Sequence, residues 1–109
     1  MITLYLRYKI DPNKLSDFAR YAADEQIPIA ESGGKIVGYF LPTDFAGPTN
    51  EAFGLIDFPS LAEYEVYRAR LAAHPLHKEN AEVLANAGAV LSIQRWLIER
   101  VESAKEAQR

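Results

Sequence analysis

The strands that this sequence predicts carry apolar or aromatic side chains on both faces, and no other feature restricts the fold as strongly. Four segments have the composition or alternation of strands: residues 1–10, 35–41, 51–58 and 90–101. Helices on one side of a sheet bury only one face, and a face left in water is normally polar. The second apolar face therefore predicts an interface, most simply with the same face of a second copy. The opposed sets are Ile36 and Phe40 against Val37, Tyr39 and Leu41; Phe53 and Leu55 against Ile56 and Phe58; and Leu91, Ile93 and Leu97 against Trp96 and Ile98.

Helix start and stop signals lie between these strands. Asp11-Pro12 can cap and open a helix that reaches about residue 30, and Gly33-Gly34 ends it. Ser60 opens a second helical region, His74-Pro75 breaks that region, and Gly88 ends it. The order is β-α-β-β-α-β, which predicts an α+β fold with a four-stranded antiparallel sheet and helices on one face.

Composition limits the classes of protein to which the chain can belong. Its 109 residues suit one domain, which we place at residues 1–101. Residues 102–109 form a polar tail, which has too little apolar surface to cover the second face of the sheet. The net charge is −3 and no basic stripe occurs, so we expect no nucleic-acid partner. No apolar run approaches the roughly 20 residues of a membrane helix. Cysteine is absent and the chain begins on a strand-like alternation, so we expect a cytoplasmic protein without disulfides.

Four short motifs, in order, give the chain a family resemblance. They are Tyr5-Leu6-Arg7, Gly38-Tyr39-Phe40, Phe58-Pro59-Ser60-Leu61 and the stretch from Arg68 to Pro75. Over residues 1–101 this set resembles the NIPSNAP family of the dimeric α/β-barrel superfamily. The resemblance implies ferredoxin-like subunits that form a homodimer. Relatives elsewhere in that superfamily include cofactor-free monooxygenases, haem-degrading enzymes and lactone isomerases, and the fold alone does not choose among them.

The sheet face turned away from the helices is the candidate ligand site. Arg7 would bind a carboxylate or phosphate, Tyr5 and Tyr39 would donate hydrogen bonds or a proton, and Trp96 would offer a flat surface beside Gln94. A cavity with a few convergent polar groups is the usual form of a small-molecule site. The alternative is that Arg7 pairs with a strand carboxylate, either Glu51 or Asp57, and only neutralises it.

The two histidines are weak site candidates. His74 and His77 lack a third metal ligand with the right spacing, so we expect His74 to cap a helix and His77 to be exposed, with no metal. Haem ligation by one histidine is the open alternative. The basic residues Arg68, Arg70, His74 and Lys78 have acidic neighbours, which indicates a solvated face.

Three functions remain open. The first is a cofactor-independent enzyme acting on a small planar or carboxylated molecule, with catalytic residues unassigned. The second is a protein that binds such a molecule in the dimeric barrel without turnover. The third is a non-enzymatic dimeric interaction module. A haem-binding or monooxygenase-like relative is a further alternative.

Overall fold

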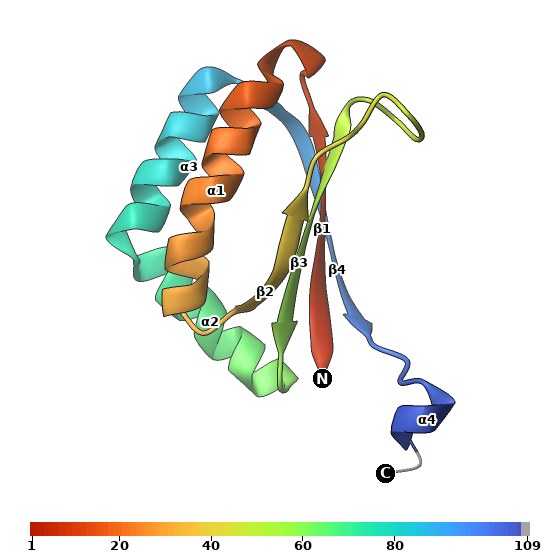
Figure 1. Cartoon of the computed structure of the whole chain (residues 1–109). Helices are drawn as coiled ribbons and strands as arrows, with labels where there is room; N and C mark the ends of the chain where they lie inside the picture. Colours follow the sequence, from red (N-terminus) through yellow and green to blue (C-terminus); the bar gives the residue numbers. More distant parts are fainter. Residues whose placement is uncertain (108–109) are drawn as a thin grey trace.

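The computed structural model describes residues 1–107 as one open antiparallel sheet with a layer of helices on one side (Figure 1). The strand order in the sheet is β2-β3-β1-β4. This is the predicted α+β, ferredoxin-like fold. The elements in chain order are β1 (Ile2–Ile10), the 3-10 turn η1 (Pro12–Lys14), α1 (Leu15–Glu31), β2 (Lys35–Phe40), β3 (Glu51–Phe58), α2 (Leu61–Ala73), α3 (Pro75–Ala87), β4 (Val90–Glu99) and α4 (Ala104–Ala107).

Local signals set these boundaries. The Asp11 carboxylate accepts a hydrogen bond from the Asn13 amide at 2.9 Å and so opens the first helical region at Pro12. Ser60 caps α2, because its hydroxyl accepts from the Glu63 amide at 3.2 Å. Gly88 ends α3 with φ +66°, a left-handed conformation that glycine adopts without strain. Strands β2 and β4 end slightly earlier than predicted, at Phe40 and Glu99.

The helix-side face of the sheet forms the core. Alternate residues of β1 from Leu4 to Ile10 pack there, together with Phe58 of β3 and Phe18 of α1, both fully buried. Burying one such side chain contributes about 1.5–3 kcal/mol to stability. The period-two alternation of β1 therefore decides which of its residues meet the helices.

One face assignment in β2 is wrong. Ile36 lies opposite Ile56 on the helix side, and the register then shifts, so that Tyr39 lies opposite Gly54 on that same side. A Cβ on Gly54 would lie 2.9 Å from the Tyr39 ring, so the glycine leaves the space that the ring occupies. A β-bulge adds one residue to a strand and reverses the faces of those that follow. Phe40 consequently lies on the face opposite Ile36.

Strand β4 is uncovered on both faces. Its helix-side residues Ile93 and Leu97 are 40% and 43% exposed, because the helices pack over the other strands and leave this edge open (Figure 1). On the other face Trp96 is 44% exposed. Tyr5 lies edge-on to both Phe53 and Trp96, with ring centroids 5.9 and 5.3 Å apart, so the open face carries a continuous aromatic surface.

The end of the chain adds little to the fold. The predicted polar tail contains one helical turn, α4, and residues 108–109 lie outside the described part. Within residues 1–107, every helix is too short or too polar to cross a bilayer.

Candidate functional site

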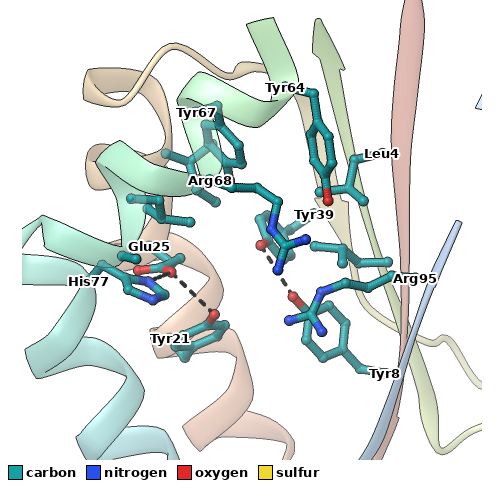
Figure 2. Close-up of a pocket in the computed structure, with 14 residues that line it drawn as sticks. Leu4, Tyr8, Tyr21, Glu25, Tyr39, Tyr64, Tyr67, Arg68, His77 and Arg95 are labelled. Atoms are coloured by element: carbon teal, nitrogen blue, oxygen red, sulfur yellow. Dashed lines mark hydrogen bonds and ion pairs between the residues drawn. The ribbon is translucent and has the colours of Figure 1, made fainter. Parts of the chain in front are cut away.

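A cavity of about 220 Å³ lies between the helices and the sheet (Figure 2). Its floor comes from β1, β2 and β4, and its walls come from α1, α2 and α3. Tyrosine side chains from both layers enclose it, and polar groups stand at opposite ends. The lining residues are Leu4, Leu6, Tyr8, Tyr21, Glu25, Ile29, Tyr39, Tyr64, Tyr67, Arg68, Leu71, Ala72, His77 and Arg95.

A buried carboxylate occupies the end of the cavity between α1 and α3. Glu25 is only 1% exposed, and its Oε2 lies 2.5 Å from Nδ1 of His77. The amide nitrogen of Asn80 donates to Glu25 Oε1 at 3.2 Å, and the Tyr21 hydroxyl donates to Oε2 at 3.4 Å. A carboxylate in such a place is stable only when neighbouring groups hydrogen-bond to it.

Two tyrosines meet on the sheet side of the cavity, near the arginines (Figure 2). The hydroxyl oxygens of Tyr8, on β1, and Tyr39, on β2, lie 3.3 Å apart. Burial raises the pKa of both phenols, and also that of Tyr21, above the ordinary value of 10. All three hydroxyls therefore stay protonated at neutral pH. The Tyr21 proton goes to Glu25, and either Tyr8 or Tyr39 donates to the other, so one proton of the Tyr8–Tyr39 pair is free to bond to a guest in the cavity.

Two arginines occupy the other end. Arg68 extends from α2 and Arg95 from β4, and their guanidinium groups reach toward one another in the cavity (Figure 2). Among residues 1–107 neither has an acidic partner within ion-pair distance. The Arg68 guanidinium lies 6.0 Å from the centre of the Tyr64 ring. The cavity thus has a cationic end and a carboxylate–imidazole end.

The predicted ligand residues divide between the two sides of the sheet. Tyr5 pairs with Trp96 and Arg7 pairs with Gln94 across β1 and β4, so the structure brings these four together on the open face as predicted. Tyr39 is not with them, because the β2 bulge places it in the helix-side cavity.

Arg7 has the carboxylate partner named as the alternative. Its Nε donates to Oε1 of Glu51 at 3.0 Å, and a terminal nitrogen contacts the same oxygen. Asp57 pairs instead with Arg100, at 2.8 Å. A hollow of about 210 Å³ lies beside the Arg7–Glu51 pair on the open face, lined also by Lys9, Ser92 and Gln94.

One of the two histidine predictions is confirmed and the other is wrong. His74 caps α3: its Nδ1 accepts from the Leu76 amide at 3.1 Å, and its Nε2 lies 2.7 Å from Glu31. His77 is not an exposed residue, because its ring packs against buried Glu25. The described residues contain no group of three or more acidic, histidine or cysteine side chains that could hold a metal ion.

Of the residues that line this cavity, the sequence analysis selected Tyr39 as a ligand residue, although on the other face, and the pattern of the chain contains signals for two more. Glu25 follows Phe18 and Ala22 and precedes Ile29 at helical spacing, so a charge stands in the buried stripe of α1. Arg95 similarly interrupts the apolar row of β4. Polar residues at positions that should be apolar are informative because burying them is costly. Arg68 is exposed, as expected for a solvated face, and it also lines the cavity.

Comparison with known proteins supports the fold and identifies relatives. The model of the NIPSNAP family matches residues 5–104. A solved NIPSNAP-like domain protein from Burkholderia xenovorans is 25% identical, with a TM-score of 0.76 over 92% of this chain and 84% of that one. A NIPSNAP family protein from Agrobacterium tumefaciens is 22% identical, with a TM-score of 0.77 over 93% of both chains.

More distant structures share the fold alone. A putative antibiotic biosynthesis monooxygenase from Nitrosomonas europaea is 6% identical, with a TM-score of 0.69 over 94% of this chain and all of that one. No curated protein sequence matches the chain.

Proposed function

The chain belongs to the NIPSNAP family, and from that premise we propose that it binds a small organic molecule in the cavity between its helices and its sheet. The observation that carries the proposal is the set of polar groups at core positions. Glu25, Tyr8 and Tyr39 stand where a ferredoxin-like layer interface is ordinarily filled by apolar side chains, and they surround a cavity of about 220 Å³.

This arrangement costs stability. A buried carboxylate requires partners to offset its lost hydration. Binding sites commonly retain such unfavourable features, whereas a purely structural core has no need of them. Tyrosine-lined walls with a few convergent donors suit a planar molecule with polar substituents.

Turnover would require a group that transfers a proton. The Glu25–His77 pair is of this kind, because a carboxylate fixed 2.5 Å from an imidazole orients the ring that would transfer the proton. Binding needs only the cavity, so the two activities can be tested separately. The proposal requires no metal and no cofactor.

We also propose that two copies pack through their open sheet faces. Trp96 and Ile98 are each 44% exposed there, and Tyr5 and Phe53 complete the aromatic surface. Removing this surface from water at about 25 cal/mol per Å² is a substantial driving force for association. A dimer of this kind would enclose the hollow beside Arg7 and Gln94, which is the second candidate ligand site.

A matched pair of variants on α2 tests the helix-side site. Ala72 lines the cavity and Ala69 does not, and both are exposed positions of one helix, so a tryptophan can be placed at either without disturbing the core. A library of planar aromatic compounds is screened against the wild type by ligand-observed NMR. We expect binders whose signals are lost with Ala72→Trp and kept with Ala69→Trp. Equal binding by both variants, or the absence of any binder, would contradict the proposal.

A further inference from the structure

The two arginines at one end of the cavity indicate the charge of a molecule that could bind there. Arg68 and Arg95 come from opposite walls, α2 and β4, and point into one space (Figure 2). Two guanidinium groups that face each other repel, and within the described chain no carboxylate lies between them. Glu25 lines the same cavity, but its bonds go to His77, Tyr21 and Asn80. The positive charge at this end is therefore left without a protein counterion.

The position of Arg95 in β4 strengthens this observation. Its pairing partner in β1 is Leu6, and its neighbours on the same face are Ile93 and Leu97, so an apolar row turns cationic at the cavity. Burial raises the pKa of Tyr8, and the nearby charge of Arg95 reduces that rise. Arg95 is an exposed residue that also lines the cavity.

We infer that the ligand carries an oxyanion, such as a carboxylate, held between Arg68 and Arg95. The inference rests on the proposed function and specifies the chemical class of the ligand. The guanidinium group presents paired N–H donors that match the two oxygens of a carboxylate. An oxyanion held between the two guanidinium groups would offset their mutual repulsion.

The two ends of the cavity then set the orientation of the ligand. Its anionic group lies at the Arg68–Arg95 end, since the Glu25 carboxylate repels it from the other end. The planar body lies along the tyrosines, within reach of the Tyr8 and Tyr39 hydroxyls. A hydroxyl or an acidic C–H at the far end of the ligand would face the Glu25–His77 pair.

A matched pair of probes tests the charge requirement: 2-naphthoate, which is planar and anionic, and 2-naphthamide, which has the same shape without the charge. Binding is followed by amide chemical shifts of the full-length chain. We expect naphthoate to bind at least 10-fold more tightly than naphthamide. Arg68→Gln and Arg95→Gln should each remove most of that advantage. The control is Arg70→Gln, on α2 and outside the cavity, which should leave both affinities unchanged.

A second measurement uses sulfate alone and does not depend on the shape of the organic probe. Sodium sulfate should raise the Tm of the wild type more than it raises that of the double variant R68Q/R95Q, at matched ionic strength. Equal binding of the two naphthyl probes in the cavity would overturn the oxyanion inference and leave the proposed site standing. If neither probe binds, a sulfate effect that the double variant loses supports the inference, and an equal sulfate effect in both proteins overturns it.

Discussion

Removing the His77 imidazole, which lies beside Glu25, should destabilise the protein more than expected for a side chain as exposed as that of His77. In His77→Ala the Glu25 carboxylate stays buried and loses its 2.5 Å contact, while its bonds to Asn80 and Tyr21 are longer, at 3.2 and 3.4 Å. A hydrogen bond to a charged group contributes about 1.5–3 kcal/mol, and a buried charge that loses its partner costs more. Because the His77 side chain is 27% exposed, water can partly replace it, and we expect a loss of about 2 kcal/mol.

The other histidine provides the control. His74→Ala removes a helix cap, worth about 1 kcal/mol, and an ion pair with a Glu31 side chain that is 59% exposed and adds little. Both variants are unfolded in urea at neutral pH and one protein concentration, because association would make stability depend on concentration. In a domain of this size 1 kcal/mol corresponds to about 4 °C in Tm.

A double variant separates the buried charge from simple loss of packing. Replacing both partners, in E25L/H77L, removes the desolvated charge and should restore most of the stability that His77→Ala loses. The same variant should lose ligand binding in the cavity. The reasoning is refuted if His77→Ala costs no more than His74→Ala, or if the double variant is as unstable as the sum of its single changes.

Three further outcomes follow from the structure. Trp96→Glu should convert a dimer to a monomer in sedimentation velocity, whereas Leu61→Glu, at an exposed position of α2, should not. Equal molecular masses for the two variants would argue against packing through the open face. Gly54→Ala should cost about 1–3 kcal/mol in urea unfolding, because its methyl group would lie 2.9 Å from the Tyr39 ring, and an unchanged midpoint would disprove that contact. Burial holds the pKa of Tyr8 and Tyr39 above 10, so the stability that these neutral phenols contribute is complete below pH 10 and decreases as the pH rises further. Tyr39→Phe should therefore reduce the slope of the free energy of unfolding against pH above pH 10. The same slope in the variant and the wild type would contradict the assignment.

The sequence was sufficient to predict the fold because its local signals agree with one another. The alternation of β1 identified the core-facing row, and the caps at Asp11 and Ser60 marked helix starts that the structure confirms. The facing of Ile93 and Leu97 in β4 also followed from composition, since Leu91, Ile93 and Leu97 form the more apolar set; Leu91 itself lies at a register shift. These are short-range properties of a chain that alternates with period two or 3.6.

The candidate site was harder to predict, because it depends on a register shift and on contacts between distant segments. One additional residue at Val37 moves Tyr39 to the other face of β2, and a count of alternating residues does not detect such a bulge. The contact between His77 and Glu25 joins α3 to α1 across 52 residues of sequence, so spacing could not have paired them. The charge at Glu25 within an apolar stripe was the local sign of a buried polar group in this layer.

The most direct test is a crystal structure of the protein with a bound member of the planar aromatic library. The account predicts electron density between the helices and the sheet, with an oxyanion between Arg68 and Arg95 and the opposite end of the molecule near Glu25. Density on the open sheet face beside Arg7 and Trp96, with the helix-side cavity empty, would contradict it.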